Sequence, residues 1–177
     1  NKKIIFCLIF FVNSLCLNAF SNDQINFDIS QIEILDGGNK IIGKKRGEIT
    51  TNDGISINAD QFEYDKIKNI LTANGNIKII DTLNNYEISS DRVVYFKNIE
   101  KIEIKGKSNS LIYSNYNFKT EDITILRKEK IINSNKNATI IDEKNQTLYE
   151  ISKFSYSLVD EIIKGEEIFV NIKYNQP

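Results

Sequence analysis

The chain has 177 residues, with 23 Lys and Arg against 24 Asp and Glu, so its formal net charge is −1. That length suits one domain with or without a processed segment, and the near-neutral charge argues against a nucleic-acid partner, which needs a basic surface. The sequence contains no His, Met or Trp. Without His, the chain cannot by itself build a Ser-His-Asp, Cys-His or His-metal site. We therefore expect no metal and no other cofactor.

The first part of the chain has the layout of a secretory signal peptide. Lysines at positions 2–3 precede an almost entirely apolar run at residues 4–17, and Ala19-Phe20-Ser21 places small residues before a cut after Ser21. The run is shorter than the ~20 apolar residues of a membrane span. We expect residues 1–21 to be a signal peptide and residues 22–177 to form the domain. An uncleaved anchor is the alternative.

Both cysteines, Cys7 and Cys16, lie in this first segment. A lipidated Cys16 would need a small residue before it, and Leu15 stands there, which disfavours a lipoprotein. After cleavage the chain would have no cysteine, so neither a disulfide nor thiol chemistry is expected in the domain.

From residue 25 to residue 174 the sequence alternates between apolar and polar residues. The clearest runs are 55–64, with one change of register near Ala59-Asp60, then 71–79 and 168–172. Alternation with period two, rich in Ile, Val, Tyr, Phe and Thr, is typical of half-buried strands. Short turns rich in Asn, Asp and Gly separate the runs. The pattern predicts an all-β domain.

The strands belong to an internal repeat. Asp60 and Asp91 lie 31 residues apart, as do Gly75 and Gly106, and a third copy begins at residues 120–122. Each unit is a strand, a turn, a second strand, then Gly and a third strand. Periods of 20–50 residues indicate a stacked array, in which each unit buries its apolar face only against its neighbours. An ordinary antiparallel sandwich with chance spacing is the alternative.

The pattern of small residue, Asp, x, aromatic or Val, x, Tyr, followed by Ala-x-Gly-Asn-Ile-x-Ile, resembles the OstA-like domain of lipopolysaccharide transport proteins. The best match runs over residues 57–65 and 71–79, and the resemblance covers about residues 27–172. That domain occurs in LptA, in LptC and as the N-terminal part of LptD. A stand-alone LptA-like protein and an LptD N-terminal periplasmic region both fit. The absence of a convincing anchor counts against LptC, and the absence of a following β-barrel region counts against a complete LptD.

The resemblance implies a fold, a place and a function. The fold is an open, twisted antiparallel β-jellyroll, V-shaped in section, built as a stack of ~30-residue repeats. The place is the periplasm after signal-peptide cleavage, with a further association with the outer membrane left open. The function is to carry lipopolysaccharide toward the outer membrane, with the lipid A acyl chains along the apolar inside. Partners would be other OstA-like domains, joined through terminal edge strands, and the outer-membrane assembly machinery.

The alternation indicates which side chains face the inside and would contact lipid. For each residue alone, plain core packing is the simpler interpretation, so the lipid-binding prediction belongs to the whole stripe. The predicted lining comprises Phe62, Tyr64, Leu71, Ala73, Ile77, Ile79, Val93, Tyr95, Ile102, Ile104, Ile123, Ile125, Phe154 and Tyr156.

Two surface features complete the reading. Lys44-Lys45-Arg46 is a basic cluster that could meet lipid A phosphates, although a solvated turn is the simpler interpretation. The run Ile168–Tyr174 has Lys173 as its one charged residue and no internal Pro. Such a strand predicts an open edge for β-augmentation.

Other classes of function are less well supported. Asp60, Asp91, Glu121 and Asp122 could supply the carboxylate pair of a glycosidase, but Asp recurs once per repeat, as a structural residue would. No phosphate-binding Gly-rich loop and no metal-ligand spacing is present, so we expect no enzyme. The alternative outside transport is a repetitive β-solenoid surface or structural protein with a closed core and no lipid ligand.

Overall fold

The computed structural model describes residues 25–172, which form seventeen β-strands and two short 3₁₀ helices in one open antiparallel sheet. The prediction of an all-β, open antiparallel fold is confirmed. The expected signal peptide at residues 1–21 lies outside the described residues. The elements are β1 (Ile25–Ile29), β2 (Ile32–Leu35), η1 (Asp36–Gly38), β3 (Lys40–Gly43), β4 (Gly47–Thr51), β5 (Ile55–Ala59), β6 (Gln61–Asp65), β7 (Ile70–Asp81), β8 (Tyr86–Phe96), η2 (Lys97–Ile99), β9 (Lys101–Ile112), β10 (Tyr116–Glu121), β11 (Ile123–Leu126), β12 (Ile131–Ser134), β13 (Ala138–Asp142), β14 (Thr147–Ile151), β15 (Lys153–Ser157), β16 (Ile162–Glu166) and β17 (Phe169–Ile172).

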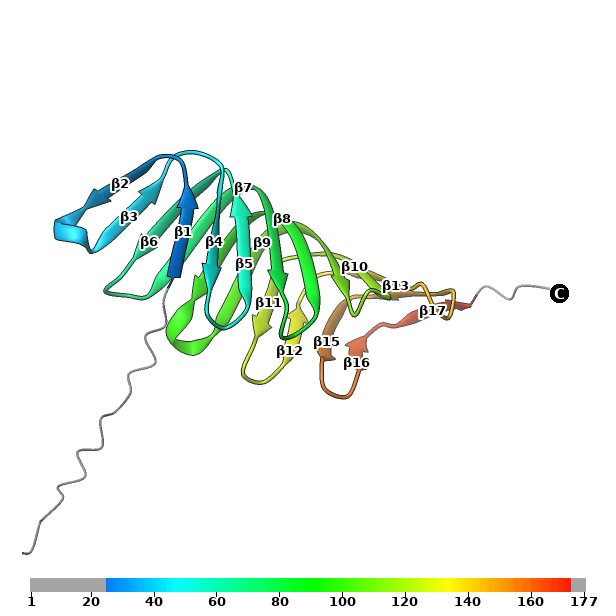
Figure 1. Cartoon of the computed structure of the whole chain (residues 1–177). Helices are drawn as coiled ribbons and strands as arrows, with labels where there is room; N and C mark the ends of the chain where they lie inside the picture. The colour runs from blue at the N-terminus through cyan, green and yellow to red at the C-terminus, as the bar shows by residue number, and fades with distance from the viewer. Residues whose placement is uncertain (1–24, 173–177) are drawn as a thin grey trace, which may run out of the picture.

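The sheet is folded lengthwise into two wings that meet along a corner (Figure 1). The long strands β7, β8 and β9 run through the corner and belong to both wings, whereas the other strands each belong to one. Wing A is the ladder β2-β3-β6-β7-β8-β9-β11-β12-β15-β16. Wing B is the ladder β1-β4-β5-β7-β8-β9-β10-β13-β14-β17. We call the hairpin ends far from the corner the tips, and the line along which the two sets of tips face each other the mouth.

Residues at one depth form straight rows across each wing. In wing A one inward row is Ile34, Ile41, Tyr64, Leu71, Tyr95, Ile102, Ile125, Ile132, Tyr156 and Ile163. Its counterpart in wing B is Phe27, Ile49, Ile57, Ile79, Ile88, Ser110, Phe118, Ile140, Tyr149 and Val170. The period-two pattern of the sequence thus becomes an apolar face along each wing, which in wing B is interrupted by Ser110.

The recurring aspartates are corner residues. Asp60 separates β5 from β6, and Asp122 separates β10 from β11; Asp91 lies where the β8–β9 register shifts. The Asp60 amide donates to the Gly75 carbonyl at 3.0 Å, and the Asp122 amide donates to the Gly106 carbonyl at 3.1 Å. Asp60 and Asp122 therefore tie the end of one short strand to the bend of a long one. Their carboxylates accept bonds at the same bends, from Asn76 Nδ2 to Asp60 Oδ2 at 2.6 Å and from the Gly106 amide to Asp122 Oδ1 at 3.0 Å, which supports a structural role.

Gly75 and Gly106 offer a matched pair of substitutions at these bends. Both have a left-handed backbone, with φ of +79° and +78°, which costs a residue with a Cβ about 1–2 kcal/mol. A Cβ on Gly75 would also lie 2.7 Å from Asp60 Oδ2, whereas one on Gly106 would meet nothing within 4 Å. We expect Gly75→Ala to lower the unfolding free energy more than Gly106→Ala in urea titrations followed by circular dichroism. Equal losses would contradict the contact with Asp60.

The apolar faces of the two wings pack against each other and form one elongated core. Ile49, Ile57, Leu71, Ile102 and Ile140 are among its fully buried members. Within residues 25–172, no helix is long and apolar enough to cross a membrane.

Candidate functional site: the apolar interior between the wings

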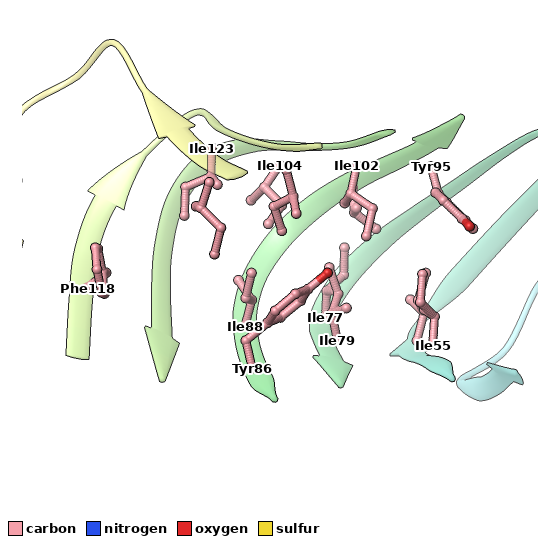
Figure 2. Close-up of a cluster of buried hydrophobic side chains, with 14 of the residues drawn as sticks. Ile55, Ile77, Ile79, Tyr86, Ile88, Tyr95, Ile102, Ile104, Phe118 and Ile123 are labelled. Carbon is pink, nitrogen blue, oxygen red and sulfur yellow. The ribbon is translucent and has the colours of Figure 1, made fainter. Parts of the chain in front are cut away.

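All fourteen residues of the predicted lining face the interior between the wings, and each is at most 6% exposed. Twelve of them lie on wing A, and only Ile77 and Ile79 lie on wing B. Figure 2 shows Tyr95, Ile102, Ile104 and Ile123 of wing A facing the wing B side chains. The sequence therefore predicted much of the wing A side of the interior, but it missed most of the wing B side. The missed wing B residues include Ile49, Ile55, Ile57, Tyr86, Ile88, Ile112, Phe118 and Ile140.

The interior differs from the expected open lining because each wing covers the other. The Phe118 ring of wing B lies 5.4 Å from the Phe154 ring and 5.3 Å from the Tyr156 ring of wing A, centroid to centroid. Facing rows of Ile and aromatic side chains fill the space, so the described interior is a packed core. Burial of this kind is what core packing requires, and it leaves lipid binding by these residues as a prediction.

The interior is less well covered at the two ends of the stack. At the N-terminal end Ile34 of β2 is 66% exposed, and at the C-terminal end Val170 and Ile172 of β17 are 45% and 50% exposed. Within residues 25–172 each of the outermost strands β1, β2, β16 and β17 pairs on one side only. The apolar rows thus continue to both ends and stop at unpaired edges.

A buried ionic cluster joins the tips of the wings halfway along the mouth. Arg127 follows β11 at the tip of wing A and is 5% exposed. Its Nε donates to Asp81 Oδ2 at 2.7 Å, its Nη1 donates to Asp53 Oδ2 at 2.5 Å and its Nη2 donates to the Asp53 carbonyl at 2.8 Å. Tyr95 Oη of wing A also donates to Asp53 Oδ2, at 3.1 Å. We call Arg127, Asp53, Asp81 and Tyr95 the clasp.

The clasp shifts the ionisation of its members in opposite directions. Burial alone would raise the pKa of Asp53, but the hydrogen bond from Thr51 and the charge and hydrogen bond of Arg127 outweigh it, so the pKa lies below its ordinary value. Burial would lower the pKa of Arg127, and Asp81 and Asp53 together raise it. Burial and the Asp53 carboxylate both raise the pKa of Tyr95. At neutral pH the clasp therefore holds an arginine cation, an Asp53 anion and a neutral Tyr95.

The clasp predicts acid sensitivity. A carboxyl whose pKa is lower in the folded state contributes stability above its unfolded pKa of about 3.9, and this stability is lost as the pH falls through the folded value. We expect the melting temperature to fall below about pH 4, and to fall less steeply in Asp53→Asn. Glu129→Gln, on an exposed turn outside the clasp, should keep the wild-type slope. Calorimetry between pH 7 and pH 2.5 measures this, and identical slopes for Asp53→Asn and wild type would contradict it.

The sequence analysis missed the clasp, although its pattern contains a signal. Arg127 continues the inward alternation of Ile123 and Ile125, and Asp81 continues that of Ile77 and Ile79. An Arg and an Asp at inward positions, each at the end of a strand, indicate buried partners of opposite charge.

The basic cluster lies at the corner between β3 and β4. Lys44 Nζ contacts Glu33 Oε2 at 2.8 Å, and Arg46 Nη1 contacts Asp60 Oδ1 at 2.9 Å. Two of its three cations thus pair within the chain on the surface, in line with a solvated turn. A polar hollow of about 1110 Å³ lies nearby, on the exposed face of wing B around Lys78, Ser89, Asn109 and Lys119. Its lining reaches the corner and includes Ile77 of the predicted lining, which is 2% exposed.

Comparisons with known proteins give a limited result. No family model matches the sequence, and no curated protein matches it. Among solved structures, the chain is similar to LptH of Pseudomonas aeruginosa, described as the LptA homologous periplasmic component of the conserved lipopolysaccharide transport device. The identity is 10%, the match covers 86% of this chain and 97% of that one, and the TM-score is 0.36. A similarity of this size decides neither family nor function.

Proposed function

We propose that this protein is a periplasmic, non-enzymatic conduit for lipopolysaccharide. In this proposal the lipid A acyl chains lie between the wings, against the predicted lining, and the polar part of the lipid stays at the mouth. Apolar burial supplies about 0.8 kcal/mol per methylene group, so no charged cage is needed. The protein would act with the outer-membrane assembly machinery.

The observation that carries the proposal is that, within residues 25–172, both ends of the stack are unpaired edges. Stacked-repeat proteins need polar terminal units to stay soluble, yet the inward rows here end on Ile34 of β2 and Val170 of β17, both exposed. An apolar interior that reaches both ends suits a channel that continues into a neighbouring domain.

The strand directions support joining to a second OstA-like domain, for which a second copy is the simplest case. In wing A, β16 runs from tip to corner and β2 runs from corner to tip. In wing B, β17 runs from corner to tip and β1 runs from tip to corner. When β16 and β17 of one copy meet β2 and β1 of the next, both wings continue as antiparallel ladders. The alternation of strand direction is then unbroken across the junction.

The rows also indicate a register for this junction. Continuing the inward row of wing A places Ile163 opposite Ile34 of the next copy, and that of wing B places Val170 opposite Phe27 of the next copy. In the same register the exposed Lys164 faces Glu33 of the next copy. Apolar residues then meet on the inside and opposite charges meet on the outside.

Photo-crosslinking tests the lipid prediction. A photoreactive amino acid at Ile77, Val93 or Ile104 should capture purified lipopolysaccharide, whereas one at Lys78 or Lys105, on the exposed faces of wings B and A, should not. Mass spectrometry of the adducts gives the readout. Equal labelling of both faces would rule out the interior as the binding site.

The packed core favours a second candidate. Because the predicted lining is at most 6% exposed, the protein could be a repetitive structural β-stack without a lipid ligand. In that case no position would capture lipopolysaccharide, while end-to-end assembly would persist.

A further inference from the structure

The interior can take an acyl chain only if its two covering faces separate. The fourteen predicted lining residues are buried by the opposite wing, and no strand ladder joins the wings at the mouth within residues 25–172. Each wing is hydrogen-bonded within itself, and the long strands β7, β8 and β9 connect the two through the corner. The mouth is thus the line along which the wings can separate without breaking a ladder.

We propose that the clasp is a releasable latch on the mouth: the wings part when Arg127 leaves Asp53 and Asp81, and lipid enters sideways between the tips. The entry of lipid rests on the function proposed above, whereas the latch itself rests on the contacts. In terms of that function, the latch regulates access to the interior.

The contacts across the mouth place the latch at Arg127. Toward the N-terminal end the tips meet through the Phe27 and Tyr64 rings, with centroids 6.0 Å apart, and toward the C-terminal end through the Tyr116 and Tyr156 rings, also 6.0 Å apart. Tyr113 Oη additionally donates to the Leu158 carbonyl. Ring contacts and a neutral hydrogen bond therefore flank the ionic centre, where Arg127 donates three hydrogen bonds.

The charge balance makes the clasp a switch between two states. Asp81 has no exposed side-chain surface, and Glu100 Oε2 lies 3.6 Å from Arg127 Nη1. Three carboxylates thus surround a single guanidinium. With Arg127 in place they are bound to it or lie beside it. Without it Asp53 and Asp81, which lie together at the tip of wing B, have no cation of wing A bonded to them. Separation of the tips, which admits water, is then the way to relieve both charges.

The corner can follow such a movement. β7 and β9 bend at Gly75 and Gly106, whose left-handed backbones are easily reached without a Cβ. A change of angle at these bends moves whole wings while the rows inside each wing stay in register.

Spin-label distances test the latch. Cysteines would replace Leu83 on the wing B tip and Ile99 on the wing A tip, which are 71% and 55% exposed, in the full chain with Cys7 and Cys16 changed to Ser. We expect one narrow distance distribution in the parent chain and a longer, broader one in Arg127→Met. Arg92→Met removes an exposed arginine at the corner and should leave the distribution unchanged.

A second variant guards against simple unfolding. Arg127→Met/Asp81→Asn removes both members of the buried pair, so it should fold, as circular dichroism would check. It should still show the longer distance because the three bonds that Arg127 donates across the mouth are gone. If both folded variants keep the parent distribution, the latch is wrong.

Lipid binding is read separately on the same proteins. If only the parted state binds, the apparent affinity rises with the fraction of that state, and we expect about tenfold tighter binding of purified lipid A by Arg127→Met/Asp81→Asn. Wider distances with no lipid A binding in any variant would keep the latch and refute the proposed function. Wider distances with lipid A affinity equal to the parent would refute sideways entry.

Discussion

Arg127→Met is expected to lower the free energy of unfolding by about 3–5 kcal/mol, the usual result of removing one partner from a buried ion pair. The physical reason is that the Asp81 carboxyl, with no exposed side-chain surface, would lose its ion-pair partner while it stays buried. Guanidinium titrations followed by circular dichroism measure the loss. A loss below about 1 kcal/mol would mean that the clasp behaves like a solvated surface pair.

Arg127→Met/Asp81→Asn is the matched control for this first result. Asn retains a side-chain oxygen for the turn amides of Leu83 and Asn84, which donate to Asp81 Oδ1 at 3.1 and 2.9 Å. The double variant should therefore recover part of the stability lost in the single variant. If it is instead less stable by the sum of two independent losses, the two residues are not coupled.

Val170→Pro is expected to weaken assembly through the C-terminal edge about tenfold. Proline has no amide hydrogen to donate. If the amide of residue 170 faces β14, the change breaks a bond that holds β17 in place, and if it faces the unpaired side, the change removes a donor from the junction. In both cases the ladder between the two copies is disrupted. Each lost hydrogen bond contributes about 0.5–1.5 kcal/mol, which weakens association about tenfold. Sedimentation velocity at rising concentration measures the association, with Val170→Ala as the control that keeps the donor. Equal association of both variants would rule out this edge.

Charge reversal tests the register of the junction. Lys164→Glu and Glu33→Lys should each weaken association a few-fold, the size expected for exposed charge pairs. A chain carrying both changes should recover, because each junction then again joins opposite charges. Glu33 also contacts Lys44 of the same chain at 2.8 Å. The variant Lys44→Gln removes this internal ion pair alone and so shows how much of a change in association comes from losing it. If association does not recover in the double variant, Lys164 and Glu33 do not meet at the junction and the proposed register is wrong.

The strands and corners could be predicted from the sequence, because they depend on local features. Period-two alternation determines which side of a strand faces inward, and the Asp and Gly spacings mark where the sheet bends. What covers an inward face is not local. It depends on how far the sheet folds at Asp91 and the other corner residues, and so the packing of Phe118 against Phe154 was not anticipated. The clasp was missed for the same reason, since Arg127 and Asp53 are 74 positions apart.

The corner spacing also determines how such a protein can change in length. From Asp60 to Asp91 the chain visits both tips and returns to the corner, adding two strands to each wing. With neighbouring strands about 4.8 Å apart, duplicating one such segment would lengthen the stack by about 10 Å. Because it starts and ends at the corner, it would keep every inward position facing inward. Deleting half a segment would instead send all later strands into the opposite wing. Whole-segment gain or loss is therefore the tolerated route by which relatives of different span could arise.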